Sequence, residues 1–211
     1  MDAKSVNPSE FSLVSNSIQV SRLFERYGIH ANGTWTGETL RVLEESSFLF
    51  FGLAPDNFRL WNWAENLSVR LEQIPQGGLT SKNLIRLNPT NLTNWTVIHE
   101  LAHAWDASQG WQLSAWFARM TGSQFTYPLI HRLFPKDKRF WYAVGSPPPP
   151  CGSDAYFNRL EDFAESVTAY LFPEEAKHRA DQRGWGYETW GYTHFHDTPR
   201  GKLIHQLVHP Q

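Results

Sequence analysis

The stretch "TVIHELAHAWDAS", residues 96–108, places two histidines four positions apart, with a glutamate directly after the first. Residues four apart lie on one face of an α-helix, so the imidazoles of His99 and His103 can reach a common point. Neutral imidazole is a good zinc ligand, and a catalytic zinc site takes three protein ligands and keeps a fourth position open. Glu100 is rotated by about 100° from His99, beside the metal but off the ligand face. The stretch therefore predicts the zinc-binding helix of a hydrolase, with Glu100 as its general base.

The rest of this segment is typical of a helix that packs on a core. Its apolar residues recur at helical spacing and form a stripe of Trp95, Ile98, Ala102 and Trp105. Three polar residues can cap the first turn, namely Asn91, Thr93 and Asn94, and Gly110 marks the end. Asp106 lies one turn beyond His103, where it can hydrogen-bond the second ring nitrogen of a histidine. An exposed polar helix face is the alternative interpretation.

Two segments ahead of this helix alternate apolar and polar residues, as half-buried strands do. They are "LSVRLEQI", residues 67–74, and "NLIRLNP", residues 83–89, with the turn-forming "PQGG" after the first. We expect these two strands to pair as an antiparallel hairpin. An earlier helix is predicted within residues 33–53, capped by Thr36 or Thr39. Further helices are predicted over residues 18–27, 111–120, 158–172, 174–183 and 201–209.

The predicted helix over residues 158–172 offers a third metal ligand. Glu161 and Glu165 are four apart on it and share one face, where two like charges repel unless a cation or a hydrogen-bond donor lies between them. We therefore expect Glu161 to bind the zinc and Glu165 to support a ligand. The alternative is a solvated acidic face.

Two other zinc-hydrolase patterns do not fit the chain. The longer histidine signature of some zincins needs glycine and histidine where this sequence has Asp106 and Gln109. A peptide deformylase arrangement needs a ligand cysteine upstream of the histidines, whereas Cys151 lies downstream. Both patterns are therefore excluded.

Residues 67–172 resemble the gluzincin metallopeptidases. The likeness rests on "HELAHAWD", residues 99–106, followed by "NRLEDFAES", residues 158–166. Members of that family have an HExxH helix and then a later helix with an E-x-F-A-E type core. The resemblance implies an α+β, zincin-like fold, in which a small antiparallel sheet lies over the HExxH helix and the C-terminal half is mostly helical.

The same resemblance implies a complete site. It implies a Zn²⁺ cofactor held by three ligands, His99, His103 and Glu161. Glu100 is then the general base, and Glu165 buttresses a ligand. The resemblance also implies that the strand over residues 83–89 lies at the rim of the cleft as an edge strand and pairs with an extended protein or peptide substrate.

One position departs from the gluzincin pattern. Those enzymes have a tyrosine about seven residues before the ligand glutamate, as acid or oxyanion stabiliser, whereas this chain has Asp154 there. Tyr156 lies just beyond, and we expect it to take that catalytic role. The other candidates are His131, Tyr142, His194 and His196. "THFHD", residues 193–197, also suggests a second metal site, although a surface turn is the simpler interpretation.

The composition is that of a folded globular protein. With 211 residues, 41% of them hydrophobic, the chain is long enough to bury a single core. We expect a flexible tail over residues 1–17 and one domain over residues 18–211. A formal charge of −2 argues against nucleic acid or an anionic membrane as a partner. No apolar run reaches the ~20 residues that span a bilayer.

The expected compartment follows from the chain start and from cysteine usage. Residues 1–17 lack the basic start, apolar centre and cleavage site of a secretory signal. Cys151 is the only cysteine, which fits a reducing compartment. We expect a cytoplasmic protein, or one exported without a classical signal, and the sequence leaves the oligomeric state open.

Together these features predict a zinc-dependent metallopeptidase that hydrolyses peptide bonds, with a zinc-activated water and Glu100 as base. One alternative is a catalytically degenerate binding module of the same fold. The other is a zinc hydrolase that acts on a non-peptide bond. Asp154, in the place of a tyrosine, keeps both alternatives open.

Overall fold

The computed structural model describes residues 19–53, 67–121, 158–182, 184 and 186–210. The chain falls into two compact units, residues 1–100 and 101–211. The boundary between them lies inside α3 (Asn94–Ser108), which continues through it as one helix. The predicted tail over residues 1–17 lies outside the described residues.

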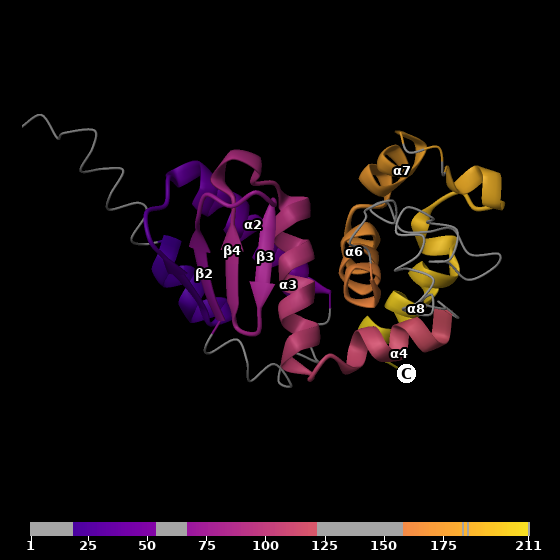
Figure 1. Cartoon of the computed structure of the whole chain (residues 1–211), viewed down its shortest axis with the longest axis horizontal. Helices are drawn as coiled ribbons and strands as arrows, with labels where there is room; N and C mark the ends of the chain where they lie inside the picture. Colours follow the sequence, from indigo (N-terminus) through magenta and orange to yellow (C-terminus); the bar gives the residue numbers. More distant parts are fainter. Residues whose placement is uncertain (1–18, 54–66, 122–157, 183, 185, 211) are drawn as a thin grey trace, which may run out of the picture. The chain divides into compact units, whose positions relative to one another are not determined.

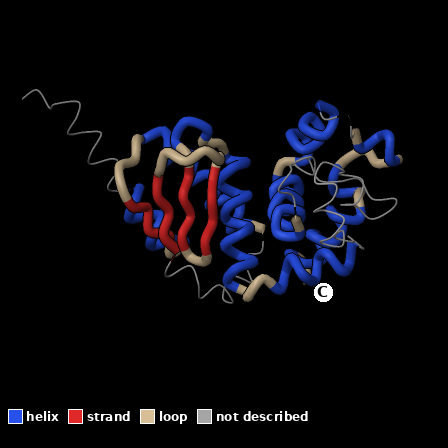
Figure 2. Tube along the Cα trace, viewed as in Figure 1, coloured by secondary structure: helices blue, strands red, loops and turns tan. Residues whose placement is uncertain are grey.

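The first unit contains a four-stranded sheet with the strand order β1-β2-β4-β3 (Figures 1 and 2). The strands are β1 (Ile29–Asn32), β2 (Leu67–Leu71), β3 (Gly78–Ser81) and β4 (Leu84–Leu87). Strands β1, β2 and β4 run parallel to one another, and β3 is antiparallel to β4. The sheet is therefore mixed, and the expectation of an antiparallel sheet is wrong.

The predicted hairpin between residues 67–74 and 83–89 is also wrong, because β2 and β4 pair in parallel. The antiparallel partner of β4 is β3, which is only four residues long and begins at a glycine that the sequence pattern assigns to a turn. Lys82 and Asn83 join β3 to β4, and Lys82 has a φ of 53°, as tight hairpin turns require. Parallel strands need a long connection, and residues 72–83, with β3 among them, supply it.

This strand order changes which strand lies at the edge of the sheet. Because β4 pairs with β2 on one side and with β3 on the other, residues 83–89 do not form an edge strand. The expectation that they offer a free edge to a substrate is wrong. Among the described strands, the one at the edge beside β4 is β3.

The buried face of the sheet lies against the first half of α3. Alternate residues of the central strands point to this face and are buried, namely Leu67, Val69, Ile85 and Leu87. Thr80 of β3 is in register with Ile85 and so points to the same face. There the Thr80 hydroxyl hydrogen-bonds Glu100 of α3.

The helices of the first unit begin at caps that the sequence predicts. Thr36 and Thr39 form a reciprocal capping box at the start of α2 (Gly37–Gly52). At the start of α3, the Thr93 hydroxyl accepts a hydrogen bond from the amide of Thr96. The α3 stripe of apolar residues is buried, and the helix ends ahead of Gly110, whose φ is 62°. These predictions are confirmed, whereas β1 is too short to show a period in the sequence.

The described residues of the second unit beyond α3 form helices and short connections. The helices are α4 (Gln112–Thr121), α6 (Arg159–Leu171), α7 (Pro173–Gln182) and α8 (Pro199–Val208), with the short 3₁₀ helices η5 (Tyr187–Trp190) and η6 (Phe195–Asp197). Helices α4 and α8 both contact α6. At the centre, the ring of Phe163 lies 5.6 Å from that of Trp105 and 5.8 Å from that of Phe117.

The described part of the chain confirms the coarse class, α+β with a small sheet and a mostly helical remainder (Figure 2). The predicted ranges of α4, α6, α7 and α8 agree with the observed ones to within two residues. Among the described helices, none is long and apolar enough to cross a membrane.

Candidate metal centre

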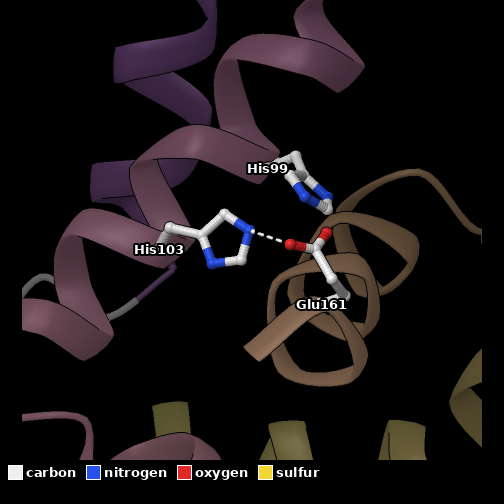
Figure 3. A group of neighbouring side chains, drawn as sticks. All are labelled: His99, His103 and Glu161. Atoms are coloured by element: carbon white, nitrogen blue, oxygen red, sulfur yellow. Dashed lines mark ion pairs between the residues drawn. The ribbon is translucent and has the colours of Figure 1, made fainter. Parts of the chain in front are cut away.

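Two histidines of α3 and one glutamate of α6 meet in the structure (Figure 3). The ligand atoms of His99, His103 and Glu161 all lie within 4.8 Å of one another. His103 Nε2 is 3.3 Å from Glu161 Oε1. His103 is buried, while His99 and Glu161 are half-buried. The structure thus brings together the three residues that the sequence predicts as metal ligands.

Local structure determines where each of these side chains stands. His99 and His103 are one turn apart on α3 and share a face, because the helix is continuous between them. Glu161 lies in the first turn of α6, where the Asn158 side chain accepts hydrogen bonds from the amides of Leu160 and Glu161 at 2.8 and 3.3 Å. This cap fixes the start of α6 and with it the backbone of Glu161.

The donor set suits zinc. Zinc binds imidazole nitrogen and carboxylate oxygen at about 2.0–2.2 Å in a tetrahedron, which places neighbouring ligand atoms about 3.3 Å apart. The distance of 3.3 Å between His103 Nε2 and Glu161 Oε1 matches that spacing. Two imidazoles and one carboxylate also leave a fourth tetrahedral position open, as catalytic zinc sites do.

Glu100 is buried but does not belong to this group, because its carboxylate lies against β3. Thr80 Oγ1 is 2.6 Å from Glu100 Oε2 and 3.1 Å from the backbone oxygen of Glu100. Gly78, two residues earlier on β3, lies so close to the Glu100 side chain that a Cβ there would be 2.5 Å from Glu100 Cγ. The sequence pattern indicates neither residue, because it assigns Gly78 to a turn and a lone threonine carries no signal.

Asp106 has a different partner from the one expected. Its Oδ1 accepts a hydrogen bond from the amide of Ser114 at 3.1 Å, in the first turn of α4. Its Oδ2 is buried without a hydrogen-bond partner among the described residues. Gly110 and Trp111 both have positive φ and bring the chain back so that α4 starts beside Asp106. Asp106 therefore satisfies an unpaired amide of α4 and not a histidine ring.

Glu165 lies within a buried charged cluster and not on a solvated face. Burial, and next the charge of Glu165, raise the pKa of Tyr187 above its ordinary value, while Arg200 acts in the opposite direction. Arg200 in turn forms a buried two-point salt bridge with Asp162, at 2.7 and 3.1 Å. The role of Glu165 as support for a metal ligand stays a prediction.

The proposed oxyanion donor, Tyr156, lies outside the described residues, together with Asp154, His131 and Tyr142. The other two candidates, His194 and His196, are described and lie elsewhere. His196 Nε2 is 2.8 Å from the backbone oxygen of Tyr170, and His194 Nδ1 is 3.6 Å from Glu174 Oε1. Tyr170 is in the last turn of α6 and Glu161 is in the first, so about 13 Å of helix separates His196 from the candidate ligand Glu161.

A second metal site over residues 193–197 finds no support in the described part of the chain. There, the one group of three His, Cys, Asp or Glu side chains close enough to share an ion is His99, His103 and Glu161. Residues 193–197 instead contain the short helix η6.

No family model matches the chain, and searches of the curated proteins and of the solved structures found no match. The case for a function therefore depends on the three converging ligands and on Glu100.

Proposed function

We propose that this protein is a zinc-dependent peptidase with a zincin-like fold. The observation that carries the proposal is the convergence of His99, His103 and Glu161, three donors of the types and spacing that zinc prefers. Glu100 directly follows His99 on α3 and is buried, with its carboxylate against β3. The zincin-like assignment is supported by a small sheet whose buried face lies against the HExxH helix.

In the proposed reaction, the two imidazoles and the Glu161 carboxylate hold the ion. When bound, zinc supplies a Lewis acid and lowers the pKa of a water towards neutrality. Glu100 takes up a proton from the attacking water and delivers it to the leaving amine of the peptide bond. Tyr156 donates a hydrogen bond to the oxyanion that develops on the substrate.

We further propose that an extended peptide substrate pairs with β3, and not with the strand over residues 83–89. This strand lies at the edge of the sheet, so it can receive an added strand through main-chain hydrogen bonds. Gly78 and Thr80 of the same strand contact Glu100. A peptide on this strand would therefore lie close to the proposed base.

The test is a comparison of metal content and peptide hydrolysis in the wild type and in Glu100→Gln. We expect the wild type to bind one zinc ion per chain and to cleave members of a peptide library in a chelator-sensitive reaction. Glu100→Gln should keep its zinc and lose activity by about 10²- to 10⁴-fold, as the loss of a general base predicts. Glu45→Gln, a partly exposed glutamate on α2, is the matched control and should behave as the wild type.

Three other outcomes would each contradict a different part of the proposed function. Full activity in Glu100→Gln would remove Glu100 from its role. A zinc-loaded protein that cleaves no peptide would contradict peptidase activity and favour a binding module or a non-peptide substrate. A protein that binds no zinc would contradict the proposal as a whole.

A further inference from the structure

The edge strand β3 contacts Glu100 through two of its four residues. Gly78 and Thr80 are alternate residues and so lie on the same face of the strand, which is the face towards α3. Both are half-buried, whereas Leu79 and Ser81 on the other face are exposed. The contacts therefore come from one face of one strand.

The Thr80 hydroxyl carries a single proton and has two acceptors within reach. The carboxylate oxygen Oε2 of Glu100 is at 2.6 Å and the backbone oxygen of Glu100 is at 3.1 Å. An O–H···O⁻ hydrogen bond is typically about 2.5–2.7 Å long and is stronger than one to a neutral carbonyl. We assign the proton to the carboxylate, so that Thr80 holds Oε2 directly.

Gly78 leaves the space that the rest of the Glu100 side chain, including Oε1, occupies. A Cβ at this position would lie 2.5 Å from Cγ, 2.6 Å from Oε1 and 2.7 Å from Cδ of Glu100. Any side chain at position 78 must therefore displace Glu100. The glycine is not needed for its backbone, because Gly78 is not among the described glycines with positive φ. It is needed for the space that Glu100 fills.

We propose that Gly78 and Thr80 are positioning residues, which hold the Glu100 carboxylate in one orientation from the edge strand. This inference rests on the proposed function for its catalytic consequence. A glutamate has three rotatable side-chain torsions, so a free Glu100 samples many orientations. A base that is already in place reacts faster than one that must first find its position, and a misplacement of about 1 Å can cost about 10²-fold in rate.

The first test is kinetic and uses the zinc-loaded full chain with a peptide substrate. Thr80→Val keeps the shape of the side chain but removes the hydroxyl, and we expect its kcat to fall about 10- to 100-fold while KM and zinc content stay within about twofold. Thr80→Ser restores a hydroxyl and should recover most of the rate. Unchanged kcat in Thr80→Val, or no recovery in Thr80→Ser, would overturn the proposal.

Glycine variants provide a second, independent comparison. Gly78→Ala should lower kcat and keep zinc, because the added methyl group moves Glu100. Gly52→Ala, at the end of α2, is the matched control, since a Cβ there meets nothing within 4 Å. If Gly78→Ala retained the wild-type kcat, Gly78 would have no positioning role.

A third test needs no activity and keeps this inference separate from the proposed function. Thermal unfolding of the zinc-free protein is compared for Thr80→Val, Glu100→Ala and the double variant. We expect Thr80→Val to lower the midpoint clearly in the wild type and only slightly in Glu100→Ala, because its partner is then already absent. Equal losses in both backgrounds would overturn the inference even in an active enzyme. Peptidase activity absent from the wild type, with coupling still present, would instead contradict the proposed function alone.

Discussion

His103 Nε2 and Glu161 Oε1 lie 3.3 Å apart, although one residue belongs to α3 and the other to α6. A histidine and a glutamate at this distance form either an ordinary polar pair or one edge of a metal site. His99, one turn earlier on α3, has its ligand atom within 4.8 Å of both. A single divalent ion accounts for the positions of all three ligand atoms.

Removal of the carboxylate ligand should weaken zinc binding. We expect the zinc dissociation constant of Glu161→Ala to rise by at least about 100-fold, because even groups that only orient zinc ligands contribute about 10- to 100-fold. Competition with a chromophoric chelator measures this constant. Glu174→Ala, an exposed glutamate on α7, is the control and should bind zinc as the wild type does. Equal affinity in Glu161→Ala and in the wild type would place the metal elsewhere.

Zinc should stabilise the folded protein through the histidine pair. A ligand that binds only the folded state adds about 4 kcal/mol at a thousandfold excess over its dissociation constant. We expect a clear rise in the thermal unfolding midpoint of the wild type on zinc addition and none in His99→Ala. His178→Ala, an exposed histidine on α7, should respond as the wild type does. The same zinc-induced rise in His99→Ala would contradict the ligand assignment.

The helices and the candidate ligand set could be predicted from the sequence because both depend on local periodicity. The spacing of His99 and His103 and the buried stripe behind them define α3 without reference to any other segment. Glu161 could also be predicted from helix periodicity. It lies four residues before Glu165 on the same helix face, and two like charges at this spacing need a compensating group. The cap residues Thr36 and Thr93 were predictable for the same local reason.

The sheet order could not be predicted because it depends on how distant segments pair. Strand β3 is too short and too rich in turn formers to appear in a pattern, and without it β2 and β4 look like the two arms of a hairpin. The hydrogen-bond partners of Asp106 and Glu100 could not be predicted either. Asp106 accepts from a backbone amide of α4, and Thr80 donates to Glu100. Neither hydrogen bond can be inferred from the identity of the residues in the sequence.

The buried salt bridge between Asp162 and Arg200 should be important for stability. Both side chains are almost fully inaccessible, and Asp162 directly follows the candidate ligand Glu161. Removal of one partner of a buried pair typically costs about 3–5 kcal/mol, because the other charge stays buried without compensation. We expect Arg200→Met to lose about this much free energy of unfolding in denaturant titrations, and to weaken zinc binding because the start of α6 loosens.

Two further variants make the Arg200 prediction specific. Asp162→Leu combined with Arg200→Met should recover part of the loss, because the Asp162 carboxylate is then no longer buried without its Arg200 partner. Lys177→Met removes the exposed pair with Glu188 and should change stability very little. A single Arg200→Met variant as stable as the wild type would show that the pair does not anchor α6.

Tyr187 should make stability fall at alkaline pH. Its hydroxyl is buried without a hydrogen-bond partner among the described residues. Burial, with the charge of Glu165, raises its pKa above the ordinary value of 10.0. Above about pH 10 the folded chain therefore holds a proton that the unfolded chain releases, and the free energy of unfolding falls as pH rises.

The Phe variant isolates this effect. We expect Tyr187→Phe to match the wild type near pH 7, since the hydroxyl makes no hydrogen bond to any described residue, and to lose less stability than the wild type above about pH 10. Denaturant unfolding at a series of pH values measures both curves. Parallel loss in the two proteins would show that Tyr187 ionises as readily in the folded state as in the unfolded one.

The central claim is that one zinc ion is held by His99, His103 and Glu161, and a crystal structure of the zinc-loaded protein tests it most directly. We predict a zinc ion about 2.0–2.2 Å from one nitrogen of each histidine and from a carboxylate oxygen of Glu161. A zinc ion bound elsewhere, or a Glu161 carboxylate that stays more than about 4 Å from the ion, would contradict the account.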